Sequence, residues 1–209
     1  MIGKNIIEIE ETGSTNLYAS DLLRSKEIPE GTVISAFRQS SGRGLGSNSW
    51  ESEAGKNLTI SIILYPSFLP IEKQFMLNKV VSLGVYDIIT KLIENTNSLV
   101  NKSIVKIKWP NDIYIGDKKV SGILIENAII GNKFLHSIVG IGININQEIF
   151  LSDAPNPVSL KNITGKEYGL KECLELLCSY LDKRYFQLKN DNYKAIDKDY
   201  LSTLYVVSS

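Results

Sequence analysis

Apolar and polar residues follow two different spacings in the first half of the chain. Short apolar runs next to glycine or proline are typical of strands. Between them, apolar residues recur every three or four positions, which is the spacing of an amphipathic helix. Ser14 and Thr15 are candidates to cap the first helix. The elements expected here are strands at Asn5–Glu11, Gly31–Arg38 and Asn57–Tyr65, and helices at Asn16–Lys26 and Ile71–Glu94.

The pattern changes to β between residues 104 and 143. Glycine turns at Gly116 and Gly131 predict hairpins between successive strands. The strands expected here are Ile104–Trp109, Ile113–Ile115, Lys119–Ile130 and Phe134–Ile143, and a last amphipathic helix is expected at Gly169–Leu188. Because strand runs and helix runs are separated rather than alternating, we expect an α+β fold.

The composition fits a single domain without a bias toward charged partners. The chain has 209 residues, 43% of them apolar, which is enough for one sizeable core. Its 23 Lys and Arg residues equal its 23 Asp and Glu residues, so no net charge draws it to nucleic acid or to an anionic membrane. The N-terminus lacks the pattern of a signal peptide, and no apolar stretch has the length of a membrane span. We therefore expect a cytoplasmic protein.

The cysteines and the histidine form no reactive cluster in the sequence. Cys173 and Cys178 lie five residues apart in one predicted helix, and no other cysteine or histidine is near them. This predicts free thiols of a reducing compartment rather than a disulfide framework or a metal site. His136 is the sole histidine and has no obvious partner, which argues against serine-triad and zinc-hydrolase chemistry.

A glycine-rich segment without periodicity, Gln39–Ser52, is expected to be a loop. Its run Gly42-Arg43-Gly44-Leu45-Gly46 lacks the third glycine of a dinucleotide fingerprint and the Gly-Lys-Ser/Thr ending of a P-loop. Glycine backbones can still turn their N–H groups toward an anion, and Arg43 can clamp a carboxylate or a phosphate. A flexible surface loop is the alternative interpretation.

Polar residues interrupt the apolar β region at Trp109-Pro110-Asn111-Asp112. Asn111 and Asp112 have the amide and carboxylate oxygens that suit a Mg²⁺–phosphate site. An Asx-type turn would place the same residues here. Lys119 opens a strand that soon becomes apolar, so its side chain can point into a cleft.

Glycines alternate with isoleucines in the segment Gly140-Ile141-Gly142-Ile143. Glycine weakens a strand unless something approaches its backbone closely. The pattern indicates either a ligand on this face or a helix packed tightly against it.

Together and in order, these segments resemble one family, the biotin–protein ligases, which are related to the lipoate–protein ligases. The resemblance runs from about Glu11 to Asn146. The matching segments are Ser14-Thr15-Asn16, Gln39, Gly42-Arg43-Gly44, Trp50, Lys108-Trp109-Pro110-Asn111-Asp112, Lys119 to Glu126, and Gly140 to Asn144. The Gly-Arg-Gly loop, the Lys-Trp-Pro-Asn-Asp run and the Lys-x-x-Gly-Ile-Leu strand form a specific signature at these spacings.

The resemblance implies a fold and a reaction. The fold would be a central mixed, largely antiparallel sheet with helices packed on it, as in class II aminoacyl-tRNA synthetases. Biotin's carboxylate would attack the α-phosphorus of ATP, giving biotinyl-5′-AMP and pyrophosphate. A lysine of a biotin carboxyl carrier protein would then accept the biotinyl group and release AMP. ATP and biotin are thus the implied substrates, and Mg²⁺ is the implied metal ion.

The resemblance also implies roles for residues of this sequence. The catalytic residues would be Lys119, Arg43 and Asp112, of which Asp112 would hold Mg²⁺. The residues expected to bind biotin are Ser14, Thr15, Asn16, Gln39, Gly42, Arg43, Gly44, Trp50, Lys119, Gly122, Ile123, Leu124 and Gly140. Those expected to bind ATP are Arg43, Lys108, Asn111, Asp112, Lys119, Ile143 and Asn144.

The sequence departs from the family pattern in two places, the glycine-rich loop and the C-terminus. Leu45 to Ser49 stand where many members have further basic residues, so Arg43 is the single cation of the loop. Members usually continue into a small C-terminal β domain, but this sequence ends at Ser209. We expect residues 1–209 to be one catalytic domain with that β domain absent or truncated. The pattern starts too close to the N-terminus to leave room for a DNA-binding helix-turn-helix.

Two other functions stay open at this point. A lipoate–protein ligase or an octanoyltransferase would share the fold and the acceptor lysine. A non-catalytic biotin sensor would share the biotin site. Gly-Arg-Gly and Lys-Trp-Pro-Asn-Asp favour biotin over lipoate. The resemblance further implies that such chains can form homodimers through their sheets.

Overall fold

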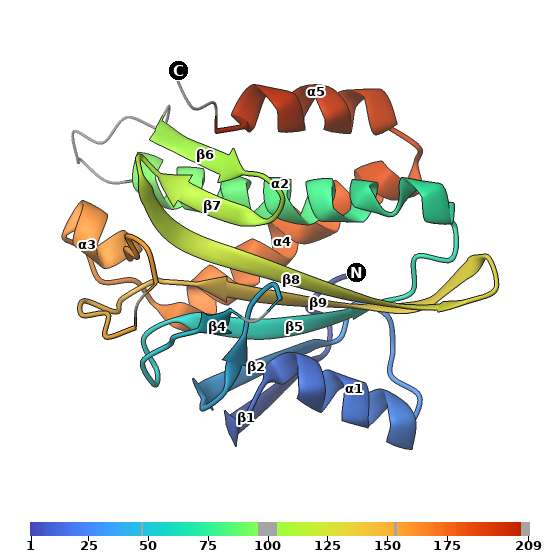
Figure 1. Cartoon of the computed structure of the whole chain (residues 1–209), viewed down its shortest axis with the longest axis horizontal. Coiled ribbons are helices and arrows are strands. Elements are labelled where there is room, and N and C mark those ends of the chain that lie inside the picture. Colours follow the sequence, from blue (N-terminus) through green and yellow to red (C-terminus); the bar gives the residue numbers. More distant parts are fainter. Residues whose placement is uncertain (47, 96–103, 153, 206–209) are drawn as a thin grey trace.

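The computed structural model describes residues 1–46, 48–95, 104–152 and 154–205. Within these ranges a seven-stranded sheet has the order β1-β2-β5-β9-β8-β7-β6 (Figure 1). Its strands are β1 (Ile6–Thr12), β2 (Val33–Gln39), β5 (Leu58–Leu64), β6 (Val105–Lys108), β7 (Asp112–Ile115), β8 (Lys118–Ile130) and β9 (Lys133–Ile143). β1 is parallel to β2, and all other neighbours are antiparallel. The predicted α+β fold with a mixed, largely antiparallel sheet is confirmed.

Helices lie on both sides of this sheet, and each side has its own core (Figure 1). The helices α2 (Phe75–Glu94), α4 (Leu170–Lys189) and α5 (Tyr193–Thr203) lie on one side, and α1 (Thr15–Ser25) lies on the other. The larger core joins the sheet to α2 and α4. The smaller core lies under α1 and includes Ala19, Ile34 and Ile63.

The central strand β5 is buried along its whole length. Ile60 and Ile62 belong to the larger core, whereas Ile63 belongs to the smaller one. Because side chains alternate across a strand, Thr59 and Ser61 share the α1 side with Ile63. Two polar side chains are therefore buried on the side of the sheet where α1 begins.

A half-buried arginine joins the three helices of the larger layer. Arg184 of α4 donates from Nε to Oδ2 of Asp87 in α2 at 2.7 Å, and from Nη1 to Oδ2 of Asp199 in α5 at 2.6 Å. Its Nη2 donates to the other oxygen of Asp87 at 3.1 Å, so the contact with α2 is bidentate. These bonds fix α5 against the rest of the layer.

The structure differs from the sequence-based expectation in three places. The segment Gln39–Ser52 is more than a loop, because β3 (Gly42–Arg43) and β4 (Ser49–Trp50) pair as a short hairpin. The predicted long helix starts with a 3-10 turn, η1 (Ile71–Lys73), before α2. The helix predicted to be the last corresponds to α4, but α5 follows it and α3 (Leu160–Thr164) precedes it. α5 buries only Ile196, Tyr200 and Thr203, so its apolar stripe is too narrow for a clear periodic signal.

Both cysteines are free and buried in α4. Burial raises the pKa of the Cys173 thiol and that of the Cys178 thiol to about 11, so both are protonated at neutral pH. None of the helices in the described ranges is both long and apolar enough to cross a membrane.

Candidate active site

Two adjoining cavities share part of their walls. The first has a volume of about 240 Å³ and the second of about 650 Å³. The residues that line both are Asn48, Ser49, Trp50, Asp112 and Lys119. Since Lys119 and Asp112 stand in this shared wall, a molecule bound in either cavity can reach the same pair of charges.

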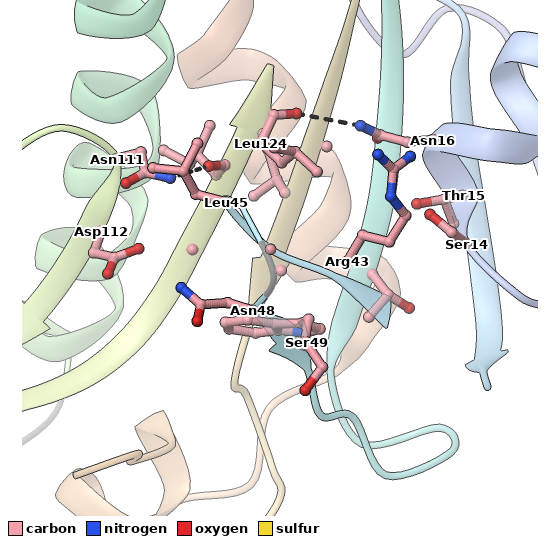
Figure 2. Close-up of a pocket in the computed structure, with 18 of the residues that line it drawn as sticks. Ser14, Thr15, Asn16, Arg43, Leu45, Asn48, Ser49, Asn111, Asp112 and Leu124 are labelled. Carbon is pink, nitrogen blue, oxygen red and sulfur yellow. Dashed lines mark hydrogen bonds between the residues drawn. The ribbon is translucent and has the colours of Figure 1, made fainter. Parts of the chain in front are cut away.

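The first cavity lies among the start of α1, the β3–β4 hairpin and strands β7, β8 and β9 (Figure 2). Its walls gather most of the residues that the sequence singled out. These are Ser14, Thr15, Asn16, Gln39, Arg43, Gly44, Trp50, Asn111, Asp112, Lys119, Gly122, Ile123, Leu124 and Gly140. Segments far apart in the sequence therefore meet around one space.

A polar network occupies the α1 end of this cavity. The backbone N–H of Thr15 donates to Oε1 of Gln39 at 2.9 Å. The hydroxyl of Ser61 donates to Oδ1 of Asn16 at 2.6 Å, and Nδ2 of Asn16 donates to the carbonyl of Leu124 at 3.3 Å (Figure 2). These bonds hold an amide, a hydroxyl and a backbone turn in fixed orientations, which gives the cavity a defined set of donors and acceptors.

Three glycines, Gly122, Gly140 and Gly142, let the side chains of Trp50 and Asn16 pack directly against the backbone of β8 and β9. A Cβ atom added at Gly140 would collide with Oδ1 of Asn16, and one added at Gly142 would collide with the indole ring of Trp50. At Gly122 the added atom would lie 3.1 Å from the same ring. The alternating glycines thus admit the Trp50 ring and the first turn of α1, and they keep the backbone of β9 open toward the cavity.

Two ion pairs stand at opposite sides of the first cavity. Lys119 Nζ lies 2.7 Å from Oδ2 of Asp112, and Arg43 Nη2 lies 3.0 Å from Oε1 of Glu126. Figure 2 shows the Arg43 guanidinium beside Asn16, with Asp112 across the cavity. The Lys119–Asp112 pair is about one-quarter exposed, so water screens it less than the Arg43–Glu126 pair, which is about two-fifths exposed.

Asn111 is tied to the neighbouring strand. Its Nδ2 donates to the carbonyl of Ile123 at 2.6 Å, and the N–H of Ile123 donates to the carbonyl of Asn111 at 3.0 Å. The side chain therefore bonds across to β8 instead of closing an Asx turn, which fixes the backbone just before Asp112.

The second cavity contains a buried acceptor without a partner. Asn144 is 3% exposed, and its Nδ2 donates to the carbonyl of Val158 at 3.2 Å. Its Oδ1 has no hydrogen-bond partner among the described residues. A buried polar atom without a partner is unfavourable, so a ligand donor would gain from bonding to it after a movement of the side chain that exposes this oxygen to the cavity. Lys108 and Tyr114 line the same cavity.

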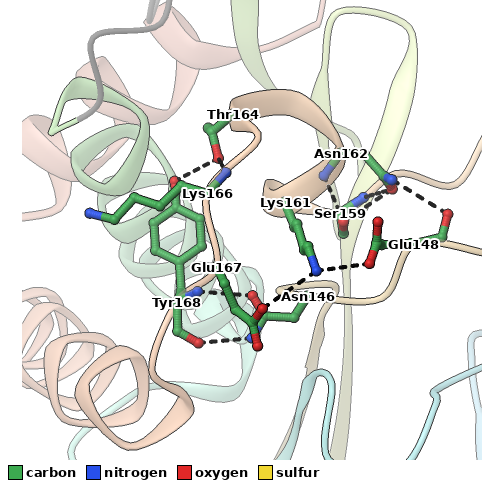
Figure 3. A network of polar contacts seen from close by, with 9 residues as sticks. All are labelled: Asn146, Glu148, Ser159, Lys161, Asn162, Thr164, Lys166, Glu167 and Tyr168. Carbon is green, nitrogen blue, oxygen red and sulfur yellow. Dashed lines mark hydrogen bonds and ion pairs between the residues drawn. The ribbon is translucent and has the colours of Figure 1, made fainter.

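A polar network braces the segment that follows Asn144 (Figure 3). Asn146 Nδ2 donates to the carbonyl of Tyr168 at 2.8 Å, and the N–H of Tyr168 donates to Oδ1 of Asn146 at 3.0 Å. Lys161 Nζ lies 2.8 Å from a carboxylate oxygen of Glu148. These contacts join the end of β9 to α3 and to the start of α4, and thereby fix one wall of the second cavity.

The carboxylate of Glu51, which lines the second cavity, is bonded to the segment that contains Gln147, Leu151 and Ser152. It accepts hydrogen bonds from the backbone N–H groups of Leu151 at 2.9 Å and Ser152 at 2.8 Å, and from Nε2 of Gln147 at 3.1 Å. Burial raises the pKa of the Glu51 carboxyl, but the hydrogen bonds from Ser152, Leu151 and Gln147 lower it more, so the pKa lies below its ordinary value.

The model of the biotin/lipoate A/B protein ligase family matches residues 8–144. This range contains every residue that lines the first cavity. The chain belongs to this family.

Curated relatives and solved structures agree with this assignment. The bifunctional ligase/repressor BirA of Bacillus subtilis is 31% identical over 190 residues, covering 88% of this chain and 55% of that protein. The biotin–[acetyl-CoA-carboxylase] ligase of Mycobacterium tuberculosis is 27% identical over 184 residues, covering 88% and 65%. The biotin protein ligase from Aquifex aeolicus, solved in complex with biotin and ATP, superposes with a TM-score of 0.79 at 30% identity over 96% of this chain and 78% of that one. The chain spans about half the length of the first curated relatives that it matches.

Of the residues expected to bind biotin or ATP, Gly42 and Ile143 line neither cavity. Gly42 packs in the hairpin, where an added Cβ would collide with the backbone of Trp50. Ile143 is fully buried in the larger core. His136 lies on β9, where burial lowers its pKa, and it lines neither cavity.

Other residues line the cavities although the sequence assigned them no role. In the first cavity these are Leu45, Asn48, Ser49, Thr59, Ile60, Pro110, Ile141 and Gly142, and in the second Glu51, Tyr114, Phe150, Ser152, Ala154, Pro155 and Pro157. One local signal was available: Thr59 and Ser61 are polar residues at alternate positions of an otherwise apolar strand. Such a pattern indicates a polar surface on one side of a buried strand.

Proposed function

We propose that this chain is a biotin–protein ligase. It would join biotin to ATP, releasing pyrophosphate, and transfer the biotinyl group from biotinyl-5′-AMP to a lysine of a biotin carboxyl carrier protein. The observation that supports this most is the wall shared by two cavities, because Lys119 stands where a carboxylate in one and a phosphate in the other would meet.

In the first step, a carboxylate oxygen of biotin bonds to the α-phosphorus of ATP while the bond from that phosphorus to pyrophosphate breaks. Both reactants are anions, so positive charge at the point of contact stabilises the transition state. Lys119 supplies this charge once the incoming anions draw its Nζ away from Asp112. Arg43 is the other cation among the described residues that line the first cavity, and we expect it, together with its glycine neighbours, to close over the bound anions.

Biotin's bicyclic ring fits the chemistry of the first cavity. Its ureido group has both donors and acceptors, and we expect it to bond to Ser14, Thr15 and Gln39. The residues proposed to cover the ring and the tail are Asn16, Gly44, Trp50, Gly122, Ile123, Leu124 and Gly140. Gly42, outside the cavity wall, would act by letting Trp50 pack closely.

We assign the second cavity to the nucleotide. The Oδ1 of Asn144, which has no partner among the described residues, would accept a hydrogen bond from the nucleotide after its side chain turns toward the cavity, and Lys108 adds a positive charge to the wall. Asn111, through its bond to the carbonyl of Ile123, would fix the backbone between β6 and β7 beside the phosphates. Ile143 would contribute only through the position of the β9 backbone that leads to Asn144.

Mg²⁺ fits this site through one carboxylate. Among the described residues, no cluster of three or more His, Cys, Asp and Glu is arranged as a metal site. Within the described part of the chain, the carboxylates that line the second cavity are those of Glu51 and Asp112, and the Glu51 carboxylate is bonded to the backbone at Leu151 and Ser152. Asp112 would hold Mg²⁺ together with phosphate oxygens once Lys119 turns from it to the incoming anions, which suits an ion that arrives with ATP. The ion would neutralise phosphate charge.

In the second step, the amine of the acceptor lysine attacks the carbonyl carbon of the mixed anhydride, and AMP leaves. No covalent bond to the enzyme is needed. Residues 1–209 would form the catalytic domain for both steps. The homodimer and the cytoplasmic location stay predictions from the sequence.

Exchange of labelled pyrophosphate into ATP tests the proposal. We expect exchange to depend on biotin and not to occur with lipoate. Exchange with lipoate alone would reassign the chain to the other branch of the family. Tight binding of biotin without any exchange would identify a sensor. Labelling of an added carrier protein with biotin then tests the transfer step separately.

A further inference from the structure

The carboxylate of Glu126 connects three segments at the edge of the first cavity. Its Oε1 accepts from Arg43 Nη2 at 3.0 Å, and its Oε2 accepts from Asn16 Nδ2 at 2.7 Å and lies 3.5 Å from Arg43 Nη1. Glu126 belongs to β8, Arg43 to the β3–β4 hairpin and Asn16 to α1. One side chain therefore couples the hairpin to the polar end of the cavity.

The place of Glu126 on its strand explains how it reaches both partners. Side chains two residues apart lie on the same face of a strand, so Gly122, Leu124 and Glu126 share one face of β8. Gly122 and Leu124 line the first cavity, and Glu126 is the next residue on that face. It stands just outside the cavity wall, at its rim.

The hairpin is held over the cavity at two points. At one of them, the Trp50 ring lies on Gly122 and Gly142. At the other, Arg43 pairs with Glu126. Arg43 is the only Lys or Arg between residues 39 and 52, so no neighbouring cation can replace it in this second contact.

We propose that Glu126 is a positioning residue that anchors Arg43 and thereby keeps the β3–β4 hairpin closed over a ligand in the first cavity. Its bond to Asn16 fixes the amide orientation at the same time. The inference rests on the proposed function, because biotin is the ligand expected there. Glu126 acts through Arg43 and Asn16 and does not touch the reacting atoms.

The rate at which labelled biotin leaves the protein tests this role. Glu126→Gln removes the charge that attracts Arg43 but keeps an oxygen that can accept from Asn16. We expect biotin to leave this variant about five times faster, the factor that corresponds to ~1 kcal/mol for a partly exposed ion pair. Glu126→Asp keeps the charge on a shorter side chain, and we expect biotin to leave it at a rate between those of the wild type and Glu126→Gln.

The chain offers a matched control in the pair of Arg38 with Glu11. Its atoms are 3.5 Å apart and its side chains are 59% and 50% exposed, so it is a surface ion pair of the same kind, and neither residue lines either cavity. Glu11→Gln should leave the release rate unchanged. The melting temperatures of both Gln variants should stay within about 4 °C of that of the wild type, the shift expected for ~1 kcal/mol in a chain of this size, which separates anchoring from a loss of folded protein.

A double variant, Arg43→Ala with Glu126→Gln, tests whether Glu126 acts through Arg43 or only through the general stability of the fold. Once Arg43 is replaced by alanine, Glu126→Gln should have no further effect on the release rate, because the two changes remove one interaction. Unchanged or slower release from Glu126→Gln itself would overturn the inference, since slower release means that Glu126 competes with the ligand for Arg43. Wild-type protein that retains no biotin would instead refute the proposed function and this inference with it.

Discussion

Lys119 Nζ lies 2.7 Å from Oδ2 of Asp112, in the wall that the two cavities share. Lys119 lies near the start of β8, and Asp112 is the first residue of β7. The antiparallel pairing of these strands brings the two side chains together. Without an anionic ligand each charge has a partner, and an arriving carboxylate or phosphate can take over the lysine.

Replacement of Lys119 by alanine is expected to lower biotin-dependent pyrophosphate exchange by at least roughly 10²-fold. Loss of one group that stabilises charge in a transition state typically costs this much. The neighbouring Lys118→Ala is the control, because Lys118 is exposed and lines neither cavity. If the exchange rate fell equally in Lys119→Ala and Lys118→Ala, Lys119 would have no specific role.

Gly142→Ala should displace the Trp50 ring, because the added Cβ would collide with it. We expect weaker binding of biotin in calorimetry and a stability loss of ~1–3 kcal/mol, the usual cost of overpacking. Gly13→Ala serves as the control, since an added Cβ there meets no atom within 4 Å. An unchanged biotin affinity in Gly142→Ala would show that the Trp50 ring is not part of the binding site.

Arg184→Ala should destabilise the whole domain without acting at the site. The guanidinium is 13% exposed and bonds to Asp87 and Asp199, so its removal leaves Asp87 half-buried without its cation. We expect the free energy of unfolding in urea to fall by ~3 kcal/mol. Arg24→Ala, which removes an exposed pair with Asp21, should change it by less than about 0.5 kcal/mol.

The Glu51 carboxyl should contribute a pH-dependent part of the stability. Its pKa in the folded protein lies below the ordinary value of 4.5, so the unfolded chain binds this proton more tightly. The contribution is complete above about pH 4.5 and is lost as the pH falls through the lower, folded-state pKa. Glu51→Gln should therefore be less stable than the wild type at pH 7, and the difference should shrink below pH 4.5.

Unfolding in urea at several pH values measures this difference. Glu53→Gln is the matched control, because Glu53 is exposed and only its backbone N–H takes part in the network, through Gln147. A stability gap between Glu51→Gln and the wild type that stays constant down to pH 3 would show that the three hydrogen bonds do not depend on the charge of Glu51.

Most elements could be predicted from the sequence because their signals are local. The spacing of apolar residues indicates α2 and α4, and the glycine turns at Gly116 and Gly131 indicate the hairpins. The order of the motifs was enough to identify a resemblance to the family, which the match over residues 8–144 then confirmed. The weakly periodic α5 and the hairpin inside the glycine-rich segment gave no such signal.

The motifs of the sequence were enough to predict the fold class and many of the side chains that line the first cavity, including Lys119, Asp112 and Arg43. Which residues become partners follows from the packing of the folded chain. It pairs Arg43 with Glu126 across 83 positions, places Ser61 under α1, and moves Gly42 and Ile143 out of the cavity walls. The physical reason is that strand periodicity shows which residues share a face, whereas sheet order and helix packing determine what that face meets.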